Sequence, residues 1–223
     1  MEDGKLMIKI IYEDNHLLVV EKPVNVPVQE DNSGDLDFLN ILKNYIKVRD
    51  NKPGNVFLGL VHRLDRPVGG IMVFAKTSKC ASRLSEQIRR KDFKKIYYAV
   101  VEGKLSAKGM FRDKLLKDKK SNTVTVDENG KEAILDYELV RARDDLSLVK
   151  INLQTGRAHQ IRVQFSSRGH SLYGDQRYNT NAKVGQQIAL FSESITFSHP
   201  ITREKVTYKT KLPDKYPWNV FEI

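Results

Sequence analysis

The chain has 223 residues, of which 40% are hydrophobic, and this is enough for a folded protein with a buried core. The 38 Lys and Arg residues outnumber the 28 Asp and Glu residues, and the formal net charge of +10 favours a polyanionic partner. Nucleic acid is the first candidate for this partner, and an anionic membrane surface is the second. A single cysteine, Cys80, excludes a disulfide within the chain, and the five histidines have no ligand-like spacing, so we predict no metal. Because no apolar run approaches ~20 residues and residues 2–5 lack a signal-peptide pattern, a cytoplasmic protein without a membrane anchor is expected.

The first third of the chain predicts a hairpin or two adjacent strands, then a helix and a strand pair. Two β-rich runs at 6–12 and 17–21 flank a polar turn, which predicts paired strands that end before Pro23 and Pro27. An amphipathic helix ending near residues 49–54 is then predicted from apolar residues at helical spacing, namely Leu36, Leu39, Leu42 and Ile46, with Phe38 and Tyr45 beside them.

A charged turn at 61–70 lies between two apolar runs at 56–60 and 71–75, which predict strands. Pro67 and two glycines interrupt regular pairing there, so Arg63 and Asp65 are expected to project from a sheet edge, where functional residues are common. For this motif alone, a solvated loop with surface charges is the alternative.

A second helix and a basic run follow the charged turn. Thr77 or Ser78 is expected to cap the helix, whose inner stripe is Ala81, Leu84 and Ile88. Residues 89–95 hold five cations around Phe93, and this run is either a solvated face or a nucleic-acid contact. In the strand predicted at 96–101, alternation places Tyr97 and Tyr98 on opposite faces.

The second half of the chain predicts further strands and one short helix. Residues 109–131 are rich in lysine, and Asn129-Gly130 predicts a hairpin turn before a strand at 133–140; this hairpin either contacts a phosphate backbone or is solvated. A strand at 148–153 leads into a predicted helix at 157–165, which Gly169 ends.

That helix carries Ala158, Ile161 and Phe165 on one face. His159 and Arg162 are three residues apart, so they share the opposite face and can point at one site. An exposed basic helix is the alternative for this motif alone. The runs around Ile195 and Val206 predict a closing hairpin.

Five motifs together resemble the RluA-type family of pseudouridine synthases in order and rough spacing: Val19 to Pro23, His62 to Asp65, Lys95 to Ala99, Thr155 to Arg162, and Gly169 to Asp175. The most specific pair is His-Arg-Leu-Asp with Thr-Gly-Arg-Ala-His-Gln-Ile-Arg about ninety residues later. The chain departs from the family at Pro67-Val68-Gly69-Gly70, where a Thr-Ser-Gly run is usual.

The resemblance implies an α/β protein of the α+β type, with a mixed, mostly antiparallel bent sheet flanked by helices and a central RNA-binding cleft. Residues 1–223 are expected to form a single catalytic domain, with no room for an N-terminal S4 domain. The partner is then structured RNA, ribosomal or transfer, the protein is a monomer, and no cofactor is needed.

The implied reaction turns uridine in RNA into pseudouridine: the bond from C1′ to N1 breaks, the uracil turns over, and C5 bonds to C1′. Resemblance makes Asp65 the acid at C1′, either as nucleophile or as base at C2′, as positive charge at C1′ suits a carboxylate. Tyr97 is expected to stack on the uracil, and Arg162 is the expected ionic partner that keeps Asp65 charged. The uridine must be flipped out of its stack, and Arg63 with His62 is placed to fill the gap.

The remaining candidate RNA contacts come from the basic run and from the Thr-Gly-Arg motif: Arg89, Arg90, Lys94, Lys95, Arg157, His159 and Gln160. Two other functions compete. A catalytically silent RNA-binding or ribosome-assembly factor on the same fold would show the same basic surface, although Asp65, Tyr97 and Arg162 are intact. A nuclease lacks support, because no acidic cluster for metal ions appears.

Overall fold

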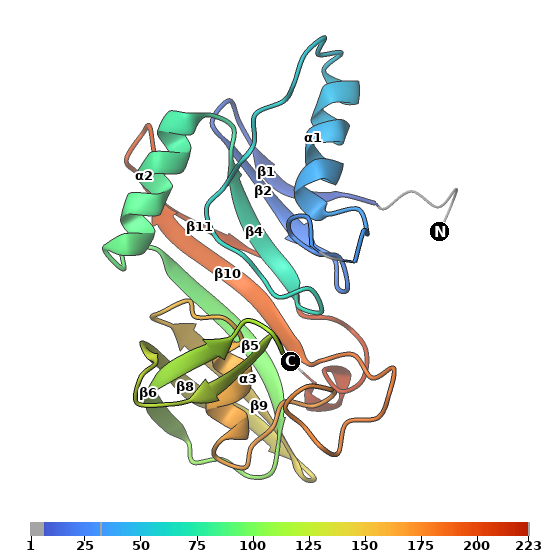
Figure 1. Ribbon diagram of the computed structural model, residues 1–223, viewed down its shortest axis with the longest axis vertical. Coiled ribbons are helices and arrows are strands. Elements are labelled where there is room, and N and C mark those ends of the chain that lie inside the picture. Colours follow the sequence, from blue (N-terminus) through green and yellow to red (C-terminus); the bar gives the residue numbers. More distant parts are fainter. Residues whose placement is uncertain (1–6, 32, 223) are drawn as a thin grey trace. The chain divides into compact units, whose positions relative to one another are not determined.

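The computed structural model describes residues 7–31 and 33–222 and divides the chain into two compact units. Unit 1 comprises Met1–Phe93 and Ser194–Thr210, and unit 2 comprises Lys94–Glu193 and Lys211–Ile223. The start of the first predicted strand, Leu6, and the segment 2–5 lie outside the described residues. Each unit combines strands with few helices (Figure 1), in keeping with the predicted α+β class.

The helices are α1 (Phe38–Arg49), α2 (Ser78–Arg89) and α3 (Gln160–Ser166), with a 3-10 turn, η1, at Asn219–Phe221. The strands are β1 (Lys9–Glu13), β2 (Leu17–Lys22), β3 (Gly59–Leu60), β4 (Gly69–Ala75), β5 (Lys94–Glu102), β6 (Lys108–Asp118), β7 (Thr123–Val126), β8 (Lys131–Arg143), β9 (Leu146–Leu153), β10 (Leu190–Ser198) and β11 (Lys205–Lys209). Every strand pairing described below is antiparallel.

In unit 1, β2 lies between β1 and β4, and β3 pairs with β4. The predicted hairpins β1–β2 and β10–β11 are confirmed, the latter with Phe197 opposite Val206. Strands β2 and β4 are almost wholly buried. The sequence of β4 is a continuous apolar run rather than an alternating one, as is typical of a strand that is buried on both faces.

Helix α1 begins one residue after Asp37, whose side chain accepts a hydrogen bond from Asn40 N. Its buried stripe is Phe38, Leu42 and Ile46. The prediction that Leu36 belongs to this stripe was wrong: its side chain is 77% exposed, because the cap at Asp37 leaves it outside the helix.

Helix α2 begins where predicted, with the Thr77 side chain accepting a hydrogen bond from Cys80 N. It packs Leu84 and Cys80 into a core that also contains Ile195 and Phe197. Phe93 and Phe197 stack with their ring centroids 5.1 Å apart, so β10 supplies part of the core of unit 1 although it lies a hundred residues further along the chain.

In unit 2, the strands follow the order β5, β9, β8, β6, β7. β7 pairs with β6 and not across the Asn129-Gly130 turn, so the prediction of a hairpin at that turn was wrong. The turn at 127–130 instead carries the chain past β6, and Gly130 is needed there because a Cβ would lie 2.4 Å from the Leu115 carbonyl carbon.

Helix α3 is buried rather than exposed. Its residues from Gln160 to Phe165 are all buried, whereas Ala158, predicted to lie on the inner face, precedes the helix and is exposed. His159 is the N-cap residue with φ +50°, so it lies outside the helix and does not share a helical face with Arg162 as predicted. The predicted end is confirmed, with Gly169 at φ +78° and His170 N donating to the Phe165 carbonyl.

Candidate active site

Asp65 lies in a tight turn between β3 and β4 of unit 1. Val68 N donates to the Asp65 carbonyl at 2.9 Å, and Gly70, the second residue of β4, has φ +119°, a conformation that other residues rarely adopt. Asp65 is partly exposed, while Leu64 and Val68 on either side of it are buried. The apolar neighbours anchor the turn and leave the carboxylate in a fixed place at the end of the strand pair.

A buried lysine holds the same turn from the neighbouring strand. Lys22, fully buried at the end of β2, donates from Nζ to the carbonyls of Pro23 (2.8 Å), Val26 (2.7 Å) and Arg66 (3.1 Å). Burial lowers the pKa of Lys22 to about 7, and the Asp65 carboxylate acts in the opposite direction. Three acceptors match the three N–H groups of an ammonium, so Lys22 ties the Asp65 turn to β2, and it supplies a nearby positive charge when it is protonated.

The neighbours of Asp65 have different roles. The His62 ring lies against Phe93 and accepts a hydrogen bond from Val73 N at Nε2, 3.1 Å away, so it packs the turn onto β4. Arg63 is exposed. Arg66 forms ion pairs with Asp31 and Asp35, which hold the preceding loop against the turn.

The basic run divides into exposed and buried cations. Arg89 is the last residue of α2 in unit 1 and Arg90 is its C-cap. Both pair with Glu86, and these exposed ion pairs contribute little stability. Lys94 is exposed at the start of β5, but Lys95 is 8% exposed, and burial lowers its pKa. A Cβ on Gly156 would lie 3.2 Å from Lys95 Nζ, so the glycine leaves room for this side chain.

Tyr97 lies on β5 in unit 2, opposite Ile151 of β9, and is 5% exposed. Tyr98 on the other face is partly exposed, so the predicted difference between the two tyrosines is confirmed.

The loop that leads into α3 is held by one amide side chain. The Gln160 side-chain oxygen accepts from Thr155 Oγ1 (2.7 Å) and Arg157 N (3.1 Å), and its nitrogen donates to the Ile134 carbonyl (3.1 Å) and to Gln164 (3.0 Å). Gln160 is buried and uses its whole hydrogen-bonding capacity within unit 2. Arg157 is exposed, with Nε donating to the Glu132 carbonyl.

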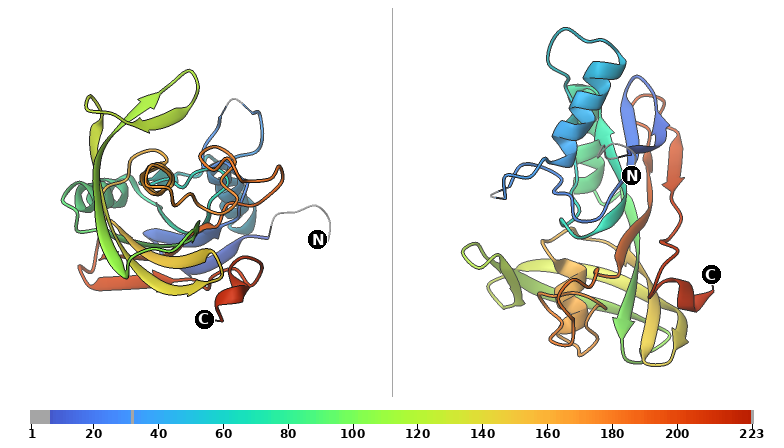
Figure 2. Two further views of the ribbon diagram at one scale, coloured as in Figure 1. Left: turned by 90° about the horizontal axis from the view of Figure 1, so that it is seen from below. Right: turned by 90° about the vertical axis from the view of Figure 1, so that its right-hand side faces the viewer.

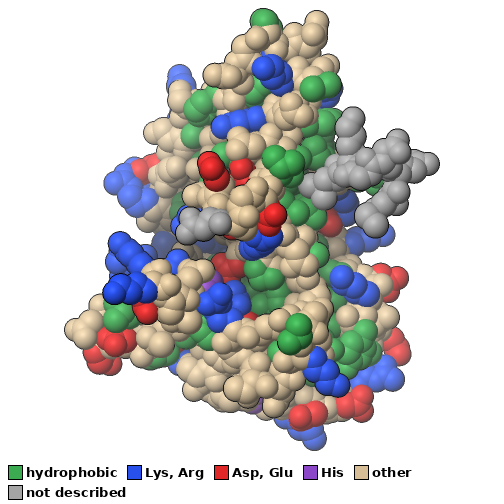
Figure 3. Space-filling view, turned by 45° about the vertical axis from the view of Figure 1, so that its right-hand side comes forward, with side chains coloured by type: hydrophobic (Ala, Val, Ile, Leu, Met, Phe, Trp, Pro, Cys, Tyr) green, Lys and Arg blue, Asp and Glu red, His purple; other side chains and the backbone are tan. Residues whose placement is uncertain are grey.

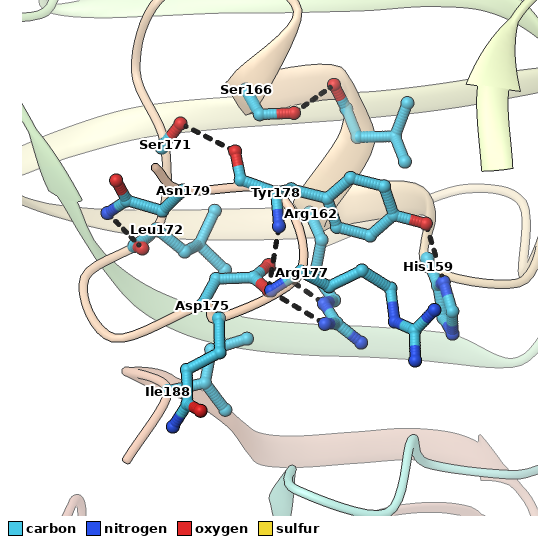
Figure 4. A network of polar contacts seen from close by, with 12 residues as sticks. His159, Arg162, Ser166, Ser171, Leu172, Asp175, Arg177, Tyr178, Asn179 and Ile188 are labelled. Carbon is cyan, nitrogen blue, oxygen red and sulfur yellow. Dashed lines mark hydrogen bonds and ion pairs between the residues drawn. The ribbon is translucent and has the colours of Figure 1, made fainter. Parts of the chain in front are cut away.

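Arg162 forms a buried, bidentate ion pair with Asp175. Arg162 Nε lies 2.8 Å from Asp175 Oδ2, and its Nη2 lies 2.7 Å from Oδ1 (Figure 4). The side chains are 7% and 0% exposed. Asp175 Oδ1 also accepts from the backbone N–H of Arg177 at 3.1 Å, so the carboxylate joins α3 to the segment that follows it.

Tyr178 connects Arg162 to His159. The Arg162 guanidinium lies 5.2 Å from the centroid of the Tyr178 ring, and the Tyr178 hydroxyl lies 2.7 Å from His159 Nδ1. The same hydroxyl accepts from Val124 N of β7 at 2.9 Å. His159 and Arg162 are thus brought together, as predicted, but through Tyr178 and not through a common helical face (Figure 4).

Sequence reasoning assigned no role to Lys22, Asp175 or Tyr178. Lys22 and Asp175 lie inside the motifs Val19 to Pro23 and Gly169 to Asp175, so their positions were marked but their contacts were not foreseen. A signal was present for Lys22, since a lysine at the end of an apolar strand needs carbonyl or carboxylate partners.

No helix within 7–31 and 33–222 is long and apolar enough to cross a membrane. In the same residues, no group of three or more His, Cys, Asp or Glu side chains could hold a metal ion.

Comparisons with known proteins agree with the motifs. Residues 16–167 match the family model described as RNA pseudouridylate synthase. The RNA pseudouridine synthase YhcT of Bacillus subtilis is 32% identical over 92% of this chain and 68% of its own length, and ribosomal large subunit pseudouridine synthase C of Buchnera aphidicola is 33% identical over 93% and 68%.

Solved structures show the same fold. Human RNA pseudouridylate synthase domain containing 4 superposes with a TM-score of 0.77 at 21% identity, covering 92% of this chain and 88% of the human one. Human RNA pseudouridylate synthase domain containing 1 superposes with a TM-score of 0.75 at 23% identity, covering 96% of this chain and 88% of the human one. The family model spans the turn that carries Asp65, the strand that carries Tyr97 and the helix that carries Arg162. The chain therefore belongs to the RluA-type family of RNA pseudouridine synthases, isomerases that convert uridine in RNA to pseudouridine.

Proposed function

We propose that this enzyme modifies uridine in large-subunit ribosomal RNA, with Asp65 as the acid that acts at C1′. The observation that carries the assignment of the acid is the Asp65 turn, which Lys22 holds through the Arg66 carbonyl while leaving the carboxylate partly exposed. The ribosomal substrate is supported by similar proteins named ribosomal large subunit pseudouridine synthases C and D. Transfer RNA is the second candidate substrate.

The reaction needs a carboxylate, a platform for the base and water-excluding walls. With Asp65 at C1′, the C1′–N1 bond breaks, the uracil turns over, and the C5–C1′ bond forms; C5 then loses its proton and N1 gains one. We propose that Tyr97 stacks on the uracil from its largely buried place on β5 and assists removal of the C5 proton. The nucleophilic and proton-abstracting roles of Asp65 both fit this sequence of bonds.

Arg162 is proposed to act as the cation that keeps Asp65 ionised. Its guanidinium is fixed at one end by Asp175 and faces the Tyr178 ring, so little freedom is lost when it meets a second anion. Lys22, whose pKa burial lowers to about 7, is a second basic side chain near Asp65.

The proposed RNA contacts fall into two groups. Exposed cations suited to phosphate are Arg63, Arg89, Arg90, Lys94 and Arg157. On the face drawn in Figure 3, Lys and Arg side chains occur in both halves, with Asp and Glu side chains among them. His62, Lys95, His159 and Gln160 are packed or bonded within their own units, so we propose that they act on the RNA by holding the loops that carry the exposed cations. Arg63 is proposed to fill the stack that the flipped uridine leaves.

The two units are proposed to form one catalytic domain of a monomeric, cytoplasmic enzyme that uses no cofactor. The test is release of tritium from ribosomal RNA labelled at C5 of uridine, with and without a chelator, because replacing the C5 hydrogen by C1′ expels it. Parent protein should release tritium in both conditions, and Asp65→Ala should release none while still binding the RNA.

Two results would change the proposal. Activity that disappears with the chelator contradicts the cofactor-free reaction. RNA binding without tritium release by the parent, on ribosomal and on transfer RNA, would favour the silent RNA-binding factor.

A further inference from the structure

The outer end of the β6–β7 hairpin carries a group of exposed lysines. Lys117, Lys119 and Lys120 are all exposed, and within residues 7–31 and 33–222 none of the three forms an ion pair. The intervening acid, Asp118, accepts from Lys120 N and Ser121 Oγ, both at 2.8 Å, so its oxygens cap the turn, and with three lysines and one aspartate residues 117–120 keep a net charge of +2. We call Lys117, Lys119, Lys120 and the neighbouring Arg177 the hairpin cations.

The hairpin base is different, because its cations are already paired. Arg112 pairs with Glu132, Lys114 with Glu128, and Arg168 with Asp113. The positive charge of the hairpin that is not paired is therefore concentrated at its outer end, which lies at the edge of unit 2 (Figure 2).

Two side chains hold the hairpin in place. Arg177 donates from one nitrogen to the carbonyls of Ser121 (3.1 Å) and Asn122 (3.2 Å), and the Tyr178 hydroxyl accepts from Val124 N. Val124 is 3% exposed and packs with Tyr178 and Val163 of α3. The hairpin is thus tied to the segment 175–178 that also fixes Arg162, and it does not depend on its own turn for its position.

The register shows which way Lys117 faces. Lys117 is directly opposite Val124, and directly opposite residues in an antiparallel pair project from the same side of the sheet. Since Val124 faces Tyr178, Lys117 projects from the side of the hairpin on which Tyr178, and with it Arg162, lies. A bound polyanion that touched Lys117 would therefore lie on the Arg162 side of the hairpin.

We propose that the end of the β6–β7 hairpin is a docking arm for the phosphate backbone of the substrate RNA. Flexible lysines with few neighbouring acids suit a run of phosphates, and fixing the arm to the segment that holds Arg162 sets the distance between the docked phosphates and the reacting uridine. An acidic protein surface is the alternative partner. The proposal rests on the proposed function, because it takes RNA as the substrate.

The test compares two triple variants that each remove three exposed lysines. Lys117→Gln/Lys119→Gln/Lys120→Gln removes the arm's charge, and Lys79→Gln/Lys205→Gln/Lys209→Gln removes the same charge from exposed positions of unit 1. Affinity for a transcribed fragment of large-subunit ribosomal RNA is measured between 50 and 200 mM salt, with single-turnover rates at saturating RNA. Thermal melts check that both variants fold as the parent does.

The arm variant should bind roughly tenfold or more weakly at low salt, and its plot of log affinity against log salt should be about 2 to 3 units less steep, because three phosphate contacts no longer release counterions. Its single-turnover rate at saturation should equal that of the parent, and the control variant should lose less affinity.

Equal losses by the two variants would overturn the proposal, since net charge and not the arm would then decide binding. An unchanged affinity of the arm variant would also overturn it and would favour the acidic protein partner. A parent that binds this RNA but forms no pseudouridine would contradict the proposed function alone, because the ratio of the two variants' affinities still decides the role of the arm.

Discussion

Replacing Asp175 by Asn should destabilise the protein strongly, because Arg162 then loses a carboxylate that is 0% exposed. Asn keeps the size of the side chain but carries no charge, and one of its two terminal atoms presents N–H groups to the donors of Arg162, which are 2.7 and 2.8 Å from the present oxygens. Breaking a buried pair by removing one partner costs about 3–5 kcal/mol, so we expect a loss of this size in the free energy of unfolding.

The assay is urea unfolding of four proteins: the parent, Asp175→Asn, Arg162→Met and the double variant. The double variant should be more stable than the sum of the single losses predicts, because neither charge is then left alone. Arg112 and Glu132 offer a matched exposed pair in the same unit, with side chains 64% and 50% exposed, and Glu132→Gln should cost about 0–1 kcal/mol.

Two outcomes would contradict this prediction: a loss of unfolding free energy from Asp175→Asn no larger than that from Glu132→Gln, or additive losses from the two buried changes. Either result would mean that water or another anion replaces the carboxylate, and that Asp175 does not fix the position of Arg162.

Three further predictions concern single residues. Burial lowers the pKa of Lys22 from 10.5 to about 7, so between these pH values the unfolded chain binds more protons than the folded one. The free energy of unfolding, measured with urea, should therefore rise from pH 7 to pH 10, and Lys22→Met should flatten this rise. Arg49, the main cause, and Lys76 lower the pKa of Glu13 from 4.5 to about 2, so Glu13→Gln should be less stable than the parent at pH 6, and thermal melts should show the difference vanishing as the pH falls through about 2. Asp65→Asn should form no pseudouridine while its RNA affinity at fixed salt stays within a few-fold of the parent, and measurable turnover would contradict the role of Asp65 at C1′.

Most strands and the two longer helices could be predicted, because the residues that determine them are close together in the sequence. The apolar run of β4, the cap at Thr77 and the pair β10–β11 all follow from residues near in sequence. Helix α3 was predicted with the right end, but its start at Gln160 and its complete burial were not, because seven residues give too little periodicity and the burial depends on β6, β7 and β8, which are distant in the sequence.

The same reason explains the turn at Asn129-Gly130. Its residues favour a tight turn, and one is formed, but pairing is decided by β6, which lies between β7 and β8. In the site, the motifs marked Asp65, Tyr97 and Arg162, whereas the ion pair of Arg162 with Asp175 joins residues whose contact no spacing rule predicts.

The discontinuity of unit 1 affects how the protein is made. Its core needs Ile195 and Phe197, which the ribosome delivers only after the whole stretch Lys94–Glu193. At about 5–20 residues per second, roughly 5 to 20 s separate the synthesis of Phe93 from that of its stacking partner. During this time β4 and α2 exist without the strand that completes their core, so the nascent chain has a period in which a chaperone could bind their exposed apolar surface.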